Sequence, residues 1–468
     1  MNKKFKSLIT DTLIFALGSV GSKLIVFFLV PLYTSVLTTE EYGTADLVFT
    51  FSELLMPIIC LAIYNSIIRF GLENKKHPED TLLCGMLVWV IGCIVSVAMA
   101  PILDLYQPIA EWKWYLILHV NASIVLCIAQ NYLKIKRLNL RYSIVSIIQT
   151  ALLAGLNIVL LLFFRLGIQG YLLSNAIASL VSAFLAMVAG NVVSDIRKSK
   201  FNKNLLVAMV KYSAPLILNN IAWWIIQSSD KVMIEMFAGA AALGLYTVAA
   251  RIPSFVNVVV NIFQQAWGIS SIVEMDSTND NEFYSKVFNA YVVLVFSVCI
   301  FINSLIKPFM KIYVGAEFYS SWKLAPLLVV SAAAFSAVAA FYGSMYCALK
   351  KSINNMLTTL LGAAVNIIMN YIFIQMMGAV GAVLGTLISY FVLALVRVID
   401  VNKYVKISIN YWIYGLNCLI LITQAVLVTI DFHGLIASII FGTLFVIVNR
   451  SEILMIIKKI INFTVRRG

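Results

Sequence analysis

The sequence predicts an all-α membrane protein that crosses the bilayer about fourteen times. The composition points to this class, because 62% of the residues are hydrophobic, only 12% are charged and the mean hydropathy is +0.95. Soluble domains carry about 25% charged residues, so a water-soluble globule is excluded. Apolar runs of about 17–25 residues, the length of a membrane-spanning helix, recur along the whole chain.

The first apolar run, residues 12–37, follows the basic segment "MNKKFK". It is longer than the roughly 7–15 apolar residues of a cleaved signal peptide, so we expect it to be retained as the first span. The further expected spans are residues 44–68, 82–103, 112–133, 142–164, 168–193, 213–237, 243–270, 286–306, 324–348, 353–376, 379–399, 410–430 and 433–449.

Basic residues are distributed unequally between the two sides of the membrane. With the N-terminus inside, the inner segments hold about 26 of the Lys and Arg residues and the outer loops about five, mostly Lys307, Lys311 and Lys323. Short loops rich in Lys and Arg stay in the cytoplasm, so both termini are expected there. The net charge of +13 then reflects topology and contact with anionic membrane lipids, not nucleic-acid binding.

Two pairs of segments indicate an internal duplication after some 200 residues. "EEYGTADLVF" at 40–49 parallels "AALGLYTVAARI" at 241–252, and "GIQGYLLSNAIAS" at 167–179 parallels "GAVGAVLGTLISY" at 378–390. The second pair carries stripes of small residues, which let membrane helices pack closely. Chance is the alternative, because Gly and Ala are common in such helices.

The duplication predicts two six-helix bundles in the same orientation, with the last two helices as an appendix. We expect an N-terminal lobe at 1–195, a basic amphipathic linker at 196–212 and a C-terminal lobe at 213–402. Helices 13 and 14 and a basic cytoplasmic tail occupy 403–468. Transporters built from repeats bind their substrate near the midplane between the two halves.

Ionisable residues inside membrane spans are costly and mark functional sites. The expected spans contain Lys23 near the middle of the first, Asp46 and Glu53 in the second, Asp230 and Lys231 in the seventh and Arg251 in the eighth. Asp46 and Glu53 share one helix face with Thr50, because the three are spaced four and three residues apart. These residues lie in the first two helices of each half, which should face each other across a central cleft.

The charges admit two interpretations. They can neutralise each other, Lys23 with Asp46 or Glu53 and Arg251 with Asp230, and hold the helices together. They can instead line a water-filled cavity in which Lys23, Lys231 and Arg251 bind the phosphate of a substrate. Asp46, Glu53 and Asp230 would then balance charge or bind a coupling ion. The candidate sugar-facing residues are Asn219, Asn220, Trp223, Trp224, Asn257, Asn261, Gln264 and Gln265, although the two tryptophans also suit packing or lipid contact.

"LTTEEYGTADLVFTFSELL" and "APLILNNIAWWIIQSSDKVMI" with the following "GAAALGLYTVAARIPSFVNVVVNIFQQAW" resemble the polysaccharide branch of the multidrug/oligosaccharidyl-lipid/polysaccharide (MOP) exporter superfamily. That branch includes O-antigen and capsule-precursor flippases. The resemblance implies two six-helix lobes in a V, two appended helices and alternating access. It also implies that the cargo is an undecaprenyl-diphosphate-linked oligosaccharide, moved to the outer leaflet of the bacterial inner membrane.

In the related lipid II flippases, cations on helices 1 and 8 and an aspartate on helix 2 serve the cavity. By position the resemblance transfers these roles to Lys23, Arg251 and Asp46, with lysine where arginine is usual on helix 1. A polysaccharide polymerase and chain-length proteins are the partners that it implies, besides membrane lipids.

No catalytic or metal motif and no G-x-x-x-x-G-K-[ST] phosphate loop is present, so we expect a transporter without a cofactor rather than an enzyme or an ATPase. A Na⁺ or H⁺ gradient or the membrane potential would supply the energy. The alternatives are a cation-coupled multidrug or organic-cation antiporter of the same superfamily and a non-transporting scaffold. The cations at least balance the acids in the expected spans, whereas a cation exporter needs an acidic, aromatic cavity.

Overall fold

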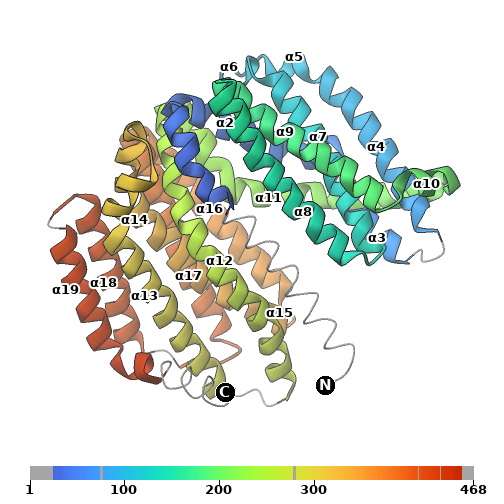
Figure 1. Cartoon of the computed structure of the whole chain (residues 1–468). Coiled ribbons are helices and arrows are strands. Elements are labelled where there is room, and N and C mark those ends of the chain that lie inside the picture. The colour runs from blue at the N-terminus through green and yellow to red at the C-terminus, as the bar shows by residue number, and fades with distance from the viewer. Residues whose placement is uncertain (1–24, 74–76, 278–280, 409, 433, 456–468) are drawn as a thin grey trace, which may run out of the picture. The chain divides into compact units, whose positions relative to one another are not determined.

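The computed structural model describes residues 25–73, 77–277, 281–408, 410–432 and 434–455 (Figure 1). All regular elements in these ranges are helices. Eleven of them are long and apolar enough to cross a membrane, and one bent helix pair adds a further span. Two shorter apolar helices, Ile25–Val36 and Gly434–Val448, lie within the first and the last of the fourteen expected spans. The prediction of an all-α, multi-pass membrane protein is confirmed.

The chain divides into two compact units, the N-terminal unit Met1–Glu235 and the C-terminal unit Met236–Gly468. The sequence instead suggested lobes that meet at a linker over residues 196–212. In the structure α11 (Lys203–Ala238) is one continuous helix, so no turn separates the basic segment from the seventh span. The boundary between the two units falls inside α11, between Glu235 and Met236, and the hydrogen bonds and ion pair described below join α11 to two other helices of the N-terminal unit.

The N-terminal unit is built around one buried helix, α7 (Lys113–Ile135), with 67% of its spanning window buried. Around α7 pack α2, α3, α4, α8 and α9. The elements in order are α2 (Thr39–Ile59), α3 (Ile63–Glu73), α4 (Pro78–Ala98), α5 (Ala100–Leu103), α6 (Gln107–Ala110), α7, α8 (Asn139–Asn157), the π-helix η1 (Ile158–Phe163), α9 (Gly167–Ala189), α10 (Val192–Lys198) and α11.

The second span is bent by 49° between α2 and α3. Pro57 lies in the last turn of α2 and has no N–H to donate to the preceding turn. Leu61 and Ala62 then adopt left-handed backbone angles, with φ of 50° and 48°. The sequence predicted one uninterrupted span at 44–68, because hydropathy does not register a bend inside an apolar run.

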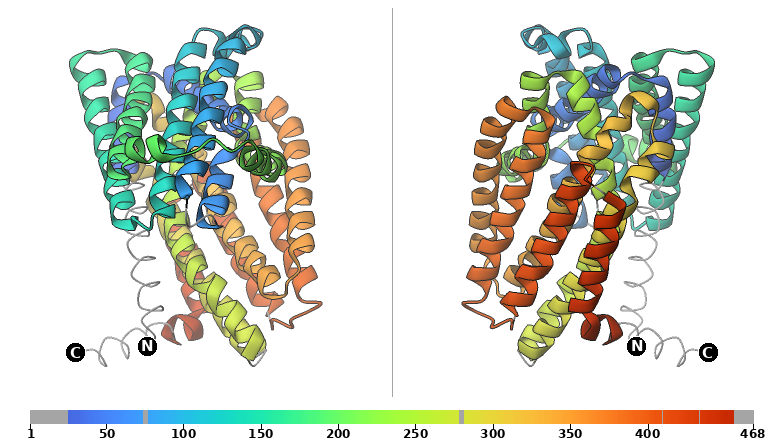
Figure 2. Two further views of the ribbon diagram at one scale, coloured as in Figure 1. Left: turned by 90° about the vertical axis from the view of Figure 1, so that its right-hand side faces the viewer. Right: turned by 90° about the vertical axis from the view of Figure 1, so that its left-hand side faces the viewer.

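The C-terminal unit contains α12 (Ala240–Ser277), α13 (Asn281–Tyr313), the 3₁₀ helix η2 (Ala316–Lys323), α14 (Ala325–Leu328), the π-helix η3 (Val329–Phe335), α15 (Ser336–Ala348), α16 (Ser352–Met377), α17 (Ala379–Val401), α18 (Tyr411–Thr429) and α19 (Gly434–Val448). Its most buried span runs from Ala325 to Tyr346, with 83% of the spanning window buried. Helices α16 and α17 lie side by side, as do α18 and α19 (Figure 2).

The packing within each unit repeats, in agreement with the internal duplication. The third to sixth spans are 39%, 67%, 22% and 44% buried, and the ninth to twelfth are 44%, 83%, 33% and 44% buried. In the N-terminal unit α9 packs on α7 and α8, and in the C-terminal unit α17 packs on α15 and α16. The small residues Gly170, Ser174 and Ala178 are buried on α9, and their counterparts Gly381, Gly385 and Ser389 are buried on α17. The two units thus share the same internal order of buried and exposed spans.

Candidate functional site

A charged pair joins α2 and α11 in the N-terminal unit. The Lys231 ammonium lies 2.9 Å from a carboxylate oxygen of Asp46, and Asp46 is only 6% exposed. A capping box between Thr38 and Glu41 fixes the start of α2 and so the face on which Asp46 lies. Asp46 therefore has a cationic partner within the N-terminal unit, one that the sequence interpretation did not select.

A second contact fixes the same two helices. The Trp224 indole N–H donates to the backbone carbonyl of Thr50 over 2.8 Å. Because Trp224 precedes Lys231 while Thr50 follows Asp46, the two helices run antiparallel along this contact. Trp223, next to it, is 48% exposed and so faces away from this packing. Of the two interpretations of the tryptophans, packing fits Trp224.

The remaining acidic residues near this pair differ in their surroundings. Asp230 is buried, and its carboxylate accepts the backbone N–H of Lys231 over 2.9 Å. Glu53 is exposed at its position on α2. Glu235, which sequence reasoning did not single out, accepts a hydrogen bond from the Tyr106 hydroxyl. Asp46 and Glu53 on α2 and Asp230 and Glu235 on α11 thus place four carboxylates on the two helices that the Lys231 pair joins.

Two of the predicted sugar-facing residues line a pocket between α3 and α11. The pocket has a volume of about 540 Å³, and Asn219 and Asn220 line it together with Arg69. Asn220 donates to the Tyr64 hydroxyl over 3.1 Å, and Arg69 forms an ion pair with Glu73 at 2.6 Å. Amide and guanidinium groups around one hollow are suited to sugar hydroxyls and phosphate oxygens. The sequence missed Arg69, because it lies at the end of the second span beyond the bend.

The predicted residues of the C-terminal unit lie on α12. Arg251 is partly buried there, and Asn261 is exposed. Asn257 donates to the carbonyl of Ala332 over 2.9 Å, so its amide helps pack α12 against η3. The amide of Gln264 bonds to both Tyr291 and Ser344, which ties α12 to α13 and α15 (the distances are 3.3 and 3.0 Å). Lys23 and the side chain of Gln265 lie outside the described residues.

Arg397 on α17 is a buried cation that the sequence interpretation did not include. Its guanidinium donates to the carbonyl of Ala339, to Asn355 and to Thr359 at 2.7, 2.8 and 2.7 Å. These acceptors are neutral and lie on α15 and α16, so Arg397 joins three helices of the C-terminal unit. In the sequence, Arg397 lies three residues before Asp400 near the end of a helix, a pattern typical of a solvent-exposed helix end. The sequence alone therefore did not indicate that Arg397 is buried. Among the described residues, no cluster of three or more His, Cys, Asp and Glu side chains could hold a metal ion.

The comparison with known families identifies the chain. A family model for polysaccharide biosynthesis proteins matches residues 8–267, more than half of the sequence. This chain belongs to that family. The match includes α2 and α11, and therefore Asp46, Asp230 and Lys231.

Relatives of this polysaccharide biosynthesis protein are distant. A protein of the Lsg locus of Haemophilus influenzae is 23% identical over 270 residues, which cover 55% of this chain and 64% of that protein. The match thus spans less than two thirds of the Haemophilus relative. A membrane protein of Methanocaldococcus jannaschii is 21% identical over 430 residues, 85% of this chain and 100% of that protein.

The comparison with solved structures shows which fold this chain has. The lipid II flippase MurJ, in an inward closed conformation, matches with a TM-score of 0.70 at 13% identity, covering 94% of this chain and all of that one. An inward-facing multidrug resistance MATE transporter of the MOP superfamily matches with a TM-score of 0.63 at 14% identity, covering 82% and 94%. The expected MOP fold is confirmed, and these neighbours are transporters rather than enzymes.

Proposed function

We propose that this protein is a flippase that moves an undecaprenyl-diphosphate-linked oligosaccharide from the inner to the outer leaflet of the bacterial cytoplasmic membrane. The family match over residues 8–267 carries the proposal. The fold shared with the lipid II flippase supports it, since the two chains align over nearly their whole length. The cargo is an O-antigen or capsule repeat unit, passed on to a polymerase and chain-length proteins on the outer side.

The pair between Lys231 and Asp46 suggests how the substrate is held. A diphosphate is a stronger multiple hydrogen-bond acceptor than one carboxylate, so it competes with Asp46 for the Lys231 ammonium. Lys23 and Arg251 bind phosphates of the same headgroup. Alternating access of the two halves then exposes the bound headgroup to the outer side. Asp46 and Glu53 take up a proton or Na⁺ on the return of the empty protein, because a buried carboxylate without a neutralising cation is costly. Substrate thus binds on the outward step and the coupling ion on the return step.

The membrane potential supplies part of the driving force. With the inside negative, each negative charge that moves outward gains about 2.3 kcal/mol per 100 mV. An anionic diphosphate is therefore driven outward, while the empty protein returns with its cations paired to carboxylates such as Asp46.

Reconstitution into proteoliposomes tests the proposal. Lys23→Ala, Lys231→Ala and Arg251→Ala should each abolish flipping of a fluorescent undecaprenyl-diphosphate glycan, whereas Lys286→Gln should not, because its pair with Glu282 is exposed at 58% and 72%. A dependence on membrane potential or ion gradient is expected in the same assay. Full flipping by the three alanine variants would refute the role of these cations, and flipping that ignores both gradients would refute the coupling.

Export of organic cations is a second candidate, favoured by the carboxylates Asp46 and Asp230 beside Lys231 and by the fold of multidrug transporters. The two functions predict opposite phenotypes on deletion of the gene. A flippase mutant accumulates lipid-linked precursor at unchanged drug resistance, and an antiporter mutant becomes drug-sensitive with normal precursor levels.

A further inference from the structure

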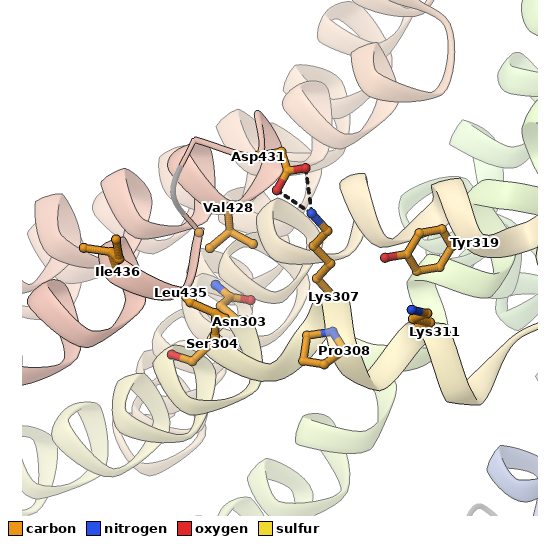
Figure 3. Close-up of a pocket in the computed structure, with 11 residues that line it drawn as sticks. Asn303, Ser304, Lys307, Pro308, Lys311, Tyr319, Val428, Asp431, Leu435 and Ile436 are labelled. Carbon is orange, nitrogen blue, oxygen red and sulfur yellow. Dashed lines mark hydrogen bonds and ion pairs between the residues drawn. The ribbon is translucent and has the colours of Figure 1, made fainter.

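A pocket of about 580 Å³ lies at one end of the C-terminal unit, between α13, η2 and the junction of α18 with α19 (Figure 3). Asn303, Lys307 and Lys311 line it from α13, four residues apart and so on one helix face. They form a polar stripe that extends over about 12 Å at a rise of 1.5 Å per residue. The pocket lies outside the residues 8–267 that the family model matches, and the transport mechanism proposed above does not involve it.

The pocket carries more positive than negative charge. The Lys307 ammonium lies 2.7 and 2.6 Å from the two carboxylate oxygens of Asp431 (Figure 3). It also lies 5.1 Å from the centre of the Trp322 ring. Lys311 is exposed and has no ion-pair partner in the part of the chain that the structure describes. One carboxylate therefore faces two ammonium groups.

The side chain of Asn303 is evidence for a ligand that is independent of the charge of the pocket. This side chain is 1% exposed, yet neither its amide nitrogen nor its amide oxygen has a hydrogen-bond partner in the structure. A buried polar group left unsatisfied costs about 1–3 kcal/mol. The negative end of the α13 dipole is sufficient to explain the two lysines, because cations are favourable at the C-terminus of a helix. It does not explain an unsatisfied buried amide on the same face. A ligand atom that accepts from the Asn303 amide nitrogen removes the part of this cost that the nitrogen carries.

The other wall adds hydrogen-bond donors and an apolar surface. Gly434, Leu435 and Ile436 line the pocket and form the first turn of α19, where backbone N–H groups have no acceptor within the helix. Such a turn favours phosphate oxygens. The side chains of Leu435 and Ile436 are 64% and 57% exposed, as expected for residues that face lipid. The site therefore combines anion binding with an apolar border.

The position of the pocket explains an exception in the charge distribution. Lys307, Lys311 and Lys323 are most of the basic residues in the expected outer loops, which the positive-inside rule leaves poor in Lys and Arg. Two of the three line the pocket, and Lys323 lies beside the Trp322 ring that Lys307 also contacts. An anionic ligand at this end of the unit accounts for Lys307 and Lys311, the two that line the pocket.

We propose that this pocket binds the phosphate headgroup of an anionic glycerophospholipid of the outer leaflet. The phosphate accepts hydrogen bonds from Lys311, from the Asn303 amide and from the first turn of α19, while the acyl chains run past Leu435 and Ile436. Lys307 keeps Asp431 neutralised, so the carboxylate does not repel the headgroup. The site is separate from the one proposed for the transported diphosphate.

The test uses the full-length protein in detergent, with native mass spectrometry and thermal unfolding as readouts. Phosphatidylglycerol should remain bound and raise Tm by several degrees, whereas phosphatidylcholine and inorganic phosphate at equal concentration should not. Asn303→Leu and Lys311→Gln should each reduce phosphatidylglycerol retention at least fivefold, and Lys323→Gln, outside the pocket lining, should leave it unchanged.

Both pocket variants are expected to fold. Lys311 is exposed, and leucine removes an unsatisfied amide from Asn303 at similar volume, so Asn303→Leu should unfold at a Tm no lower than that of the lipid-free wild type. Equal retention of phosphatidylglycerol by the wild type and both variants would overturn the site. A response to inorganic phosphate alone would show a free-anion site and overturn the lipid headgroup.

Discussion

Lys231 on α11 holds Asp46 on α2 at 2.9 Å, and the two residues are 185 positions apart in the sequence. The pair places a cation and an anion of the membrane interior in direct contact within one unit. In the proposed mechanism, the diphosphate has to displace Asp46 before it reaches the Lys231 ammonium. The stability of this pair thus sets how strongly the empty state competes with substrate.

Removing one partner of the pair should destabilise the protein more than removing both. Lys231→Ala removes the ammonium that lies 2.9 Å from the buried Asp46 carboxylate, and we expect a loss on the order of 3 kcal/mol. The double variant Lys231→Ala with Asp46→Ala should recover part of that loss. Thermal unfolding of the two single variants and the double variant measures the coupling, with Lys286→Gln as an exposed-pair control. Additive losses would contradict a direct interaction.

The neighbouring tryptophans should respond differently to the same substitution. Trp224→Phe removes the donor to the carbonyl of Thr50 and should lower the free energy of unfolding by about 1 kcal/mol. Trp223→Phe keeps an exposed aromatic ring and should change stability little. Denaturant unfolding of both variants gives the comparison, and equal effects would mean that the indole hydrogen bond is unimportant.

The junction between α7 and α10 should weaken in acid. Asp195 accepts hydrogen bonds from Tyr132 at 2.7 Å and Lys136 at 2.6 Å. Burial raises the pKa of Asp195, but the bonds from Lys136 and Tyr132 together outweigh it and hold the pKa below its usual value of 3.8. A folded-state pKa below the unfolded one means that the stabilisation is present above about pH 4 and is lost as the pH falls through the folded value.

Asp195→Asn should therefore lower Tm at about pH 7, and the difference from the wild type should shrink towards about pH 3. Unfolding scans of both proteins across this range provide the measurement. A difference in Tm that stays constant with pH would mean that the charge of Asp195 is not what stabilises the junction.

Close packing of α16 against α17 should make one glycine sensitive and another tolerant. A Cβ at Gly381 would lie 2.0 Å from the carbonyl oxygen of Phe373, so Gly381→Ala should cost more than about 1–3 kcal/mol or prevent folding. At Gly415 on α18 no atom lies within 4 Å of an added Cβ, and Gly415→Ala should stabilise the helix by about 0.5–1 kcal/mol. The yield and Tm of the two variants test this prediction. Equal yield and equal Tm for Gly381→Ala and Gly415→Ala would contradict the tight contact between α16 and α17.

Hydropathy was sufficient to predict the spans, because lipid forces each crossing segment to be apolar and helical. It did not reveal the bend at Leu61 and Ala62 or the continuity of α11 through residues 203–212, since both depend on local backbone angles. The ion-pair partner of Asp46 could not be predicted from the sequence either. Identifying Lys231 requires the register between α2 and α11, two helices that lie far apart in the chain. Arg397 was missed for the same reason, because its acceptors come from α15 and α16. The shared role predicted for Lys23 and Arg251 stays a prediction.

The recurrence of burial along the third to sixth and the ninth to twelfth spans has an evolutionary consequence. When one ancestral half is copied and fused, both copies inherit the same order of buried and exposed spans. The Lys231–Asp46 pair belongs to the first copy and the pocket at Lys307 to the second, so the two copies are not chemically equivalent.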